Sequence, residues 1–262
     1  MRYMNNRKSS IIKIIKNISG GSADSETSCI RVSGKDASNF LQGQLSNDIE
    51  ALNNNTYQIS SFLTNQGKVI ALVRIFKIND GYLILLNKEI AKYFIEKISM
   101  YILNSDVTIT LMDDFAVFGI IEDISEKILE DLKINMPYKF AQPSDDGIWI
   151  LNNSSKEYKS IILISEKSLD SNQFSKKFNF KESSENILKL TDMLEKFLRL
   201  DEKNKERYIP QILNADELNG ISFSKGCYTG QEIVARTHYL GKVKKKIFLI
   251  NSEKNLLEIN DK

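Results

Sequence analysis

The sequence predicts an α+β protein in which mostly antiparallel sheets are covered on one face by helices. Short β-branched runs flank turn signals such as Asn65-Gln66-Gly67 and Asn79-Asp80-Gly81, and this pattern indicates hairpins. Amphipathic segments with helical spacing alternate with these runs, in an order of strand, helix, strand, strand, helix that occurs about twice. The chain carries neither a dinucleotide fingerprint nor a phosphate-binding P-loop, which disfavours a nucleotide enzyme.

The first unit contains one well-marked helix. We expect Asp36 to cap it, because its carboxylate can accept the free amides of the first turn. Ala37, Phe40 and Leu41 follow at helical spacing, and the turn-prone residues 46–48 should end it. The remaining elements expected here are strands over residues 29–33, 57–63, 68–78, 82–86 and 107–111, and an amphipathic helix over 88–103.

The second unit repeats the pattern. It predicts strands at 115–121, 148–151 and 161–164, with helical segments at 124–132 and 169–178. Trp149, the only tryptophan, lies on one of these strands and should pack in the core. After it come a mostly buried helix running from Ser183 through Leu198, a charged run at 201–207 and a last strand at 244–250.

Composition limits the chemistry. Two cysteines cannot build a disulfide framework or hold an iron–sulfur cluster with four thiolates, so a reducing compartment is expected. A single histidine, His238, makes a histidine metal site or a Ser-His-Asp triad unattractive, and we predict no metal. The net charge of +2 implies no global attraction to nucleic acid or membrane. No apolar run reaches the ~18 residues of a membrane helix, so we expect a cytoplasmic protein without membrane contact.

The stretch Lys225-Gly226-Cys227-Tyr228-Thr229-Gly230-Gln231-Glu232 stands out, because a cysteine lies between two glycines. Glycines permit positive φ and close approach, so the Cys227 thiol should be presented. Residues 220–246 hold six cationic residues and one anionic residue, a field in which Lys225 and Arg236 would favour thiolate. The alternative is a solvated basic face beside a small buried cysteine.

The basic residues of this region have other readings. They could pair with an anionic small molecule. They could also contact RNA phosphates, with Tyr228, Tyr239 and Phe248 available for base stacking. A second constellation lies at the end of the first helix, where Gln42 and Gln44 could offer paired amides to a heterocycle. The alternative there is a helix C-cap with surface glutamines.

The residues 225–232 resemble the signature of the YgfZ-type folate-binding proteins, which are relatives of the glycine-cleavage T-protein, an aminomethyltransferase. Ile209-Pro210-Gln211, residues 41–48 and Gln66-Gly67-Lys68 also match, and the resemblance covers about residues 28–250. It implies a T-protein-like fold of three lobes with tetrahydrofolate bound at the centre. The C-terminal β-barrel lobe is expected to be truncated or absent.

The resemblance also implies site residues. Cys227 is the functional thiol, Lys225 and Arg236 support it, and the expected folate-binding residues are Gln42, Gln44, Phe197, Tyr228 and Gln231. Thr27 stands where family members carry an aromatic side chain, and residues 200–207 lack the usual Gly-x-Pro step. The T-protein's catalytic aspartate has no counterpart, since 87–97 offers only Glu89 and Glu96, so aminomethyl transfer is disfavoured.

We therefore expect a folate-binding accessory protein, more plausibly a non-enzyme than a transferase. Its partners would be iron–sulfur enzymes such as a tRNA methylthiotransferase, and tRNA itself. The alternatives are a folate-dependent one-carbon transferase and an RNA-binding module using Lys242–Lys246. The expected division is a basic arm (1–27), a first α+β lobe (28–113), a second (114–182), a core-completing segment (183–243) and a vestigial strand with tail (244–262).

Overall fold

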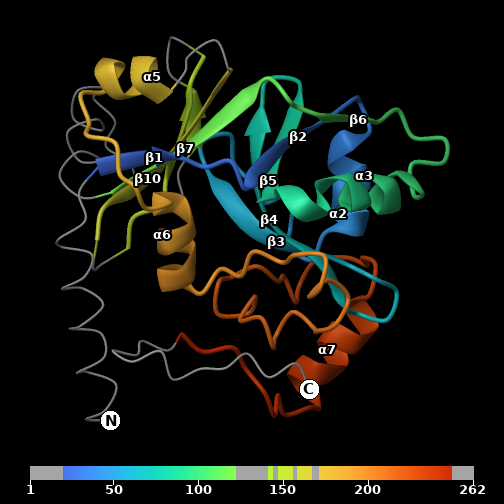
Figure 1. Cartoon of the computed structure of the whole chain (residues 1–262). Coiled ribbons are helices and arrows are strands. Elements are labelled where there is room, and N and C mark those ends of the chain that lie inside the picture. The colour runs from blue at the N-terminus through green and yellow to red at the C-terminus, as the bar shows by residue number, and fades with distance from the viewer. Residues whose placement is uncertain (1–19, 122–140, 144–146, 156–157, 167–170, 250–262) are drawn as a thin grey trace.

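The computed structural model describes residues 20–121, 141–143, 147–155, 158–166 and 171–249, and shows two antiparallel sheets with helices packed against them (Figure 1). The first sheet has the strand order β3 (Tyr57–Leu63), β4 (Val69–Ile78), β5 (Gly81–Asn87), β2 (Thr27–Ser33) and β6 (Thr108–Leu111). The second has the order β1 (Gly20–Ala23), β7 (Phe115–Ile121), β10 (Ser160–Glu166), β9 (Trp149–Asn152) and β8 (Ala141–Pro143).

Two helical segments cover one face of the first sheet. They are α2 (Ala37–Gln44) and the 3-10 turn η1 (Lys88–Ile90) that continues into α3 (Ala91–Ser99). Phe94 of α3 packs edge-on against Phe62 of β3, with ring centroids 5.3 Å apart. These contacts place the main apolar core between the helices and the sheet.

Two details of this unit differ from the predictions. The helix expected over 88–103 ends at Ser99, and Leu103 adopts a left-handed φ of 46° that no continuing α-helix allows. Asp36 stands at the N-cap of α2, but its carboxylate makes no cap bond. Instead Asp36 Oδ2 accepts from the Asp106 backbone amide at 2.8 Å and ties the helix start to the loop before β6.

The second sheet packs against the first through a shared apolar cluster. Phe76 of β4 and Trp149 of β9 meet with ring centroids 5.3 Å apart, so Trp149 packs against the core as predicted, although it is only partly buried. On its other side α5 (Ser171–Lys177) stacks Phe174 on Phe118 of β7 at 4.1 Å. The residues 20–27, which the sequence division assigned to an N-terminal arm, form β1 and the start of β2. The helix predicted over 124–132 lies outside the described residues.

The C-terminal part departs most from expectation. The helix predicted from Ser183 to Leu198 is only α6 (Ile187–Glu195), because Lys196 turns left-handed at φ 63° and closes it. A helix that was not predicted, α7 (Gln231–Tyr239), follows the cysteine motif. The strand predicted at 244–250 is wrong over its described part. Residues 244–249 run as an extended chain along a loop, where the Ile247 amide donates to the Ile212 carbonyl at 3.1 Å.

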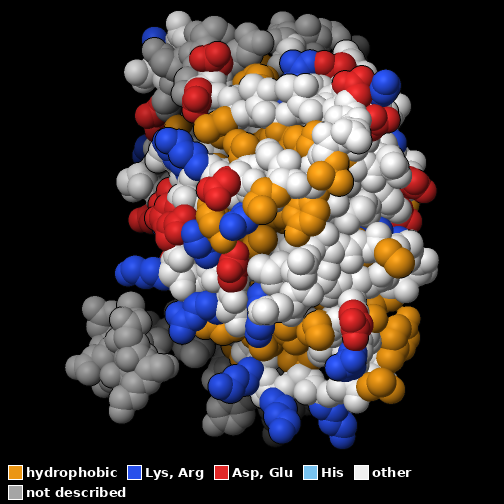
Figure 2. Space-filling view, turned by 90° about the vertical axis from the view of Figure 1, so that its right-hand side faces the viewer, with side chains coloured by type: hydrophobic (Ala, Val, Ile, Leu, Met, Phe, Trp, Pro, Cys, Tyr) orange, Lys and Arg blue, Asp and Glu red, His pale blue; other side chains and the backbone are white. Residues whose placement is uncertain are grey.

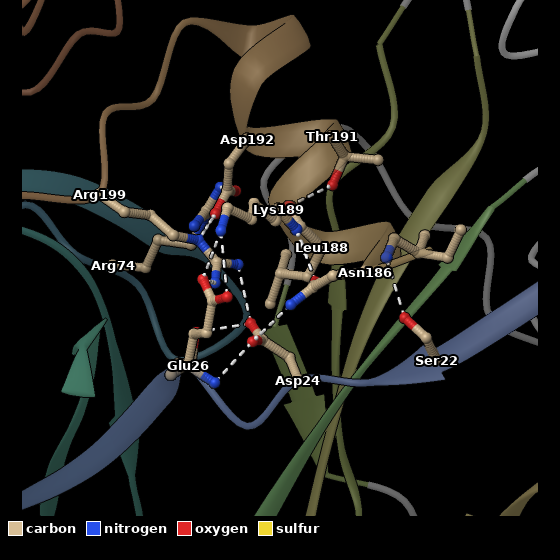
Figure 3. Close-up of polar contacts among 12 residues, drawn as sticks. Ser22, Asp24, Glu26, Arg74, Asn186, Leu188, Lys189, Thr191, Asp192 and Arg199 are labelled. Atoms are coloured by element: carbon tan, nitrogen blue, oxygen red, sulfur yellow. Dashed lines mark hydrogen bonds and ion pairs between the residues drawn. The ribbon is translucent and has the colours of Figure 1, made fainter. Parts of the chain in front are cut away.

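A buried ion network joins these parts (Figure 3). Asp192 of α6 pairs with Arg74 of β4 and with Arg199 Nε at 2.6 Å. Arg199 also reaches Asp24, in the turn between β1 and β2, at 2.8 Å. The side chains of all four are at most 9% exposed. The network therefore links both sheets to α6 and to the loop after it.

The charges of the network hold one another in the ionised state. Burial alone would raise the pKa of Asp24, but the hydrogen bond and the charge of Arg199 outweigh burial and lower that pKa. Thr27 Oγ1 donates to the same carboxylate at 2.7 Å, so the threonine found where the resemblance led us to expect an aromatic side chain serves the network. The Arg74 guanidinium lies 4.0 Å from the centroid of the Phe197 ring, which adds a cation–π contact.

We predict that Asp192→Asn lowers the free energy of unfolding by about 3–5 kcal/mol, because it leaves two buried guanidinium groups without their shared anion. Glu26→Gln is the matched control. Glu26 pairs with Lys189 at 3.0 Å on the exposed rim of the same network, so its change should cost no more than about 1 kcal/mol. Denaturant unfolding of both variants measures the difference, and equal losses would contradict a buried, coupled network.

Candidate functional site

Lys225 fastens the cysteine motif to the end of α2. Its Nζ donates to the backbone carbonyls of Gln42 at 2.6 Å, Leu45 at 2.8 Å and Asn47 at 2.8 Å. A helix end leaves carbonyls without intrahelical partners, and a cation there is favourable. Three donors of the ammonium thus meet three acceptors. Burial lowers the pKa of Lys225 to about 8, since it disfavours the charged form.

The motif is also fixed at its other end. The Thr229 amide donates to the Gly43 carbonyl at 3.1 Å, and its hydroxyl bonds to Gln44 Oε1 at 3.1 Å. Gly230 has φ 80° and caps α7, and a Cβ there would lie 2.5 Å from the Thr64 carbonyl oxygen. Gly67 of the β3–β4 turn packs closely against α7, since a Cβ added at Gly67 would lie 2.8 Å from Ile233 Cβ. Both glycines are required by this close approach.

Between these two anchors the Cys227 side chain is exposed to solvent. Gly226 beside it is also exposed, and a Cβ at that glycine would meet no atom within 4 Å. The other cysteine, Cys29, is buried in β2, where burial and the Asp24 charge raise its pKa to about 12. The expectation of a presented thiol at Cys227 therefore matches its place in the fold.

The glutamines predicted as ligands have protein partners. Gln42 Nε2 donates to Asp48 Oδ1 at 2.9 Å, and Gln42 Oε1 accepts from the Ile49 amide at 2.8 Å, so this side chain closes the turn after α2. Gln44 lies beside the motif through its bond to Thr229. Gln231 opens α7 and is half-buried.

Three other residues considered from the sequence are Tyr228, within the loop 225–230 that presents the thiol (the thiol loop), and Arg236 and His238 of α7. The Tyr228 ring is buried, and burial raises the pKa of its phenol to about 12. Arg236 pairs with Glu232 at 2.9 Å across one turn of α7, with both side chains well exposed. His238 stacks on Phe223 with ring centroids 3.7 Å apart. The cation of Arg236 is thus balanced by a neighbouring carboxylate.

Phe197 belongs to a different part of the molecule. It is buried beneath Arg74 and borders a small apolar cavity of about 170 Å³, shared with Ile247 and Phe248. The predicted site residues therefore fall into two groups, one around the thiol loop and one around Arg74. The cavity beside Phe197 has no residue of the thiol loop in its lining.

Some residues of the site were not found from sequence. Ser46 Oγ donates to the Gly220 carbonyl at 2.7 Å, and Asn47 Nδ2 bridges the carbonyls of Ile59 and Asn219 at 2.8 Å. These bonds hold the loop before the motif against β3. Their signals in the sequence were their position directly after the predicted helix end and their place in the matching stretch 41–48, neither of which indicated these bonds. Within the described ranges, no group of three His, Cys, Asp or Glu side chains is placed to hold a metal ion, and no helix there is long and apolar enough to cross a membrane.

Curated proteins similar to this chain carry one name. The tRNA-modifying protein YgfZ of Hamiltonella defensa is 31% identical over 227 residues, a match that covers 86% of this chain and 67% of that protein. The chain belongs to the YgfZ family. The YgfZ protein of Buchnera aphidicola (subspecies Baizongia pistaciae) is 31% identical over 214 residues, and that of Escherichia coli strain SE11 is 26% identical over 222 residues. These matches cover 81% and 84% of this chain, and 67% and 68% of those proteins. No protein-family model matches the chain.

A solved structure shares the fold of this YgfZ-family chain. The glycine cleavage system aminomethyltransferase T of Bartonella henselae superposes with a TM-score of 0.70 at 13% identity, covering 88% of this chain and 67% of that one. The α+β, T-protein-like fold expected from the sequence is therefore confirmed. At this identity the similarity concerns the fold alone.

We predict that Lys225→Met lowers the free energy of unfolding by roughly 2–3 kcal/mol at neutral pH, since three carbonyls lose a charged donor. The pH dependence tests the cause. Between about pH 8 and the ordinary value of 10.5, the folded lysine has lost its proton while the unfolded one keeps it. The unfolded state then binds more protons, so wild-type stability should rise with pH relative to the variant. A difference that stays constant over this window would contradict a depressed pKa at Lys225.

Proposed function

We propose that this YgfZ-family chain acts in tRNA modification as a cytoplasmic folate-binding accessory protein of iron–sulfur enzymes, such as a tRNA methylthiotransferase. The observation that carries the proposal is the exposed Cys227 thiol on a loop anchored at both ends. The relatives named as tRNA-modifying proteins and the shared aminomethyltransferase fold support it.

The loop is suited to present a reactive atom without reorganisation. Lys225 and Thr229 hold the backbone on either side of Cys227, so the thiol stays at one place relative to α2 and α7. Such a thiol can relay sulfur, respond to redox state or trap a one-carbon unit, and the proposal includes all three. In this account Lys225 positions the loop, and Arg236, paired with Glu232 on the exposed side of α7, offers its guanidinium to an anionic group.

Tetrahydrofolate is the proposed cofactor, and the residues around Arg74 fit it. Arg74 Nε and Asn153 Nδ2 are buried donors without a hydrogen-bond partner among the described residues, and the Phe197 ring lies 4.0 Å from the guanidinium. The carbonyl and carboxylate oxygens of a flat heterocycle would satisfy such donors, and its ring would pack on the side of Phe197 that borders the cavity of about 170 Å³. We propose that Phe197 lines the folate site, with Gln44, Tyr228 and Gln231 on the side of the thiol loop. Gln42 then acts by closing its turn.

The two alternative functions differ in their support. For one-carbon transfer, the carboxylates of Glu89 and Glu96 are both exposed on the surface of η1 and α3, and nothing in the structure favours them as catalysts. For RNA binding, Lys242, Lys244 and Lys245 are exposed beside Tyr239 and Phe248, which are 66% and 71% exposed. Cations interleaved with exposed rings favour this second candidate.

Complementation of a strain lacking its own YgfZ protein tests the role of Cys227. Cys227→Ser should fail to restore methylthiolated nucleosides in tRNA, measured by mass spectrometry, while Ser224→Ala on the same loop should restore them. Thiol titration checks that the variants fold: the native wild type should expose one reactive thiol and Cys227→Ser none until Cys29 is released by denaturant. Full restoration by Cys227→Ser would show that the thiol is not the functional group.

A further inference from the structure

A cavity of about 380 Å³ opens between α3 and the β3–β4 turn, on the side of the molecule that faces the viewer in Figure 2. Its volume is in the range of small-molecule sites. It contains neither Cys227 nor Phe197, so it is separate from both groups described above. Its lining combines apolar and polar side chains: the buried Phe62, Leu63 and Ile70, the more exposed Tyr93, Met100 and Tyr101, and the polar Thr64, Asn65, Gln66, Lys97 and Glu206.

Two tyrosines furnish the aromatic walls. Tyr93 is held in place, because its hydroxyl bonds to Glu206 at 2.5 Å and the Lys205 ammonium lies 3.5 Å from its ring centroid. The bond to Glu206 raises the pKa of Tyr93 to about 12, so its phenol stays neutral. Tyr101 is half-buried, and its hydroxyl reaches Asn65 Oδ1 at 3.4 Å. No cation covers the Tyr101 ring among the described residues, which leaves it available for stacking.

The amide rim is rigidly mounted. Asn65 and Gln66 are exposed at the tip of a turn closed by the bond from the Gly67 amide to the Thr64 carbonyl at 2.8 Å. Gly67 packs against Ile233 of α7, so the turn is fixed to the helix that follows the cysteine motif. The Gln66 amide has no partner among the described residues. Primary amides offer the paired donor and acceptor that match the edge of a base.

Lys97 and Glu206 both lie in the cavity lining, and further cations follow on the neighbouring loop. Lys97 lies in the lining, and its ammonium is 5.2 Å from the Tyr93 ring centroid. Lys68 Nζ donates to the Arg207 carbonyl at 3.4 Å, which brings two more cations to the neighbouring loop. Figure 2 shows Lys and Arg side chains, with Asp and Glu side chains among them, around apolar side chains on this face. Cations beyond the pocket suit a polymer whose phosphates continue outside it.

We propose that this cavity binds an unpaired base of an RNA strand. The base stacks on Tyr101, Asn65 and Gln66 hydrogen-bond to its edge, and Lys97 contacts the adjoining phosphate. Stacking of a base on an aromatic ring tolerates different sequences, and RNA recognition commonly uses unstacked bases in this way. The choice of RNA over a free nucleotide rests also on the proposed role in tRNA modification.

Fluorescence anisotropy with a short unstructured RNA, titrated with the full chain, tests the proposal. Tyr101→Ala should weaken binding at least about fivefold, as expected for stacking worth about 1–3 kcal/mol. Lys97→Ala should also weaken it, whereas Lys92→Ala, an equal charge change on the same helix outside the lining, should change it less than about twofold. If Lys97→Ala and Lys92→Ala weakened RNA binding equally, the effect would come from general charge attraction, and the assignment of this cavity as the RNA site would be overturned.

Two competition arms identify the ligand. A sugar-phosphate strand of equal length without bases should bind wild type and Tyr101→Ala alike, because it cannot stack. If adenosine or guanosine monophosphate bound as tightly as the RNA, the assignment to an RNA strand would be wrong.

Tetrahydrofolate binding should be unchanged by Tyr101→Ala. If Tyr101→Ala lost both folate binding and RNA binding, the cavity would be assigned to folate. If only Phe197 variants lost folate binding, the result would concern the proposed folate site and leave the assignment of this cavity unchanged.

Discussion

The arrangement of this molecule depends on the buried network of Asp24, Arg74, Asp192 and Arg199. It is the one described place where the β1–β2 turn, the centre of the first sheet, α6 and the following loop meet through charges. Two cations and two anions alternate there, so each desolvated charge is balanced by a partner. Because a buried charge is costly when left alone, this geometry tolerates little displacement. It therefore sets where the chain leaves α6 and begins its path toward the thiol loop.

The thiol loop then receives its own anchors from the first sheet. Lys225 takes the free carbonyls at the end of α2, and Gly230 and Gly67 allow α7 to lie against the β3–β4 turn. The same turn forms the rim of the cavity beside α3. One hairpin therefore contacts both the segment that presents Cys227 and the pocket proposed for an RNA base. The proposed RNA site and the proposed functional thiol would then both lie next to this hairpin.

Local pattern was enough to predict most strands and the early helices, since alternation and turn residues are encoded within a few positions. It failed where contacts with residues far away in the sequence determine the local structure. The Lys196 conformation ends α6 inside an apolar run, and the extended residues 244–249 bind a loop instead of a sheet. Lys225 was expected to act by charge on the thiol, yet its ammonium binds carbonyls of residues about 180 positions earlier. No periodicity could reveal that distance, whereas the compact motif 225–232 was recognisable because its residues are contiguous.

The most direct test of the proposed function is calorimetric titration of tetrahydrofolate into the purified chain under reducing conditions. The account predicts saturable binding at one site per chain, weakened by Phe197→Ala in protein that remains folded. Unfilled donors at Arg74 and Asn153 should make that binding favourable in enthalpy. Folded wild-type protein that shows no saturable binding of tetrahydrofolate would contradict the account.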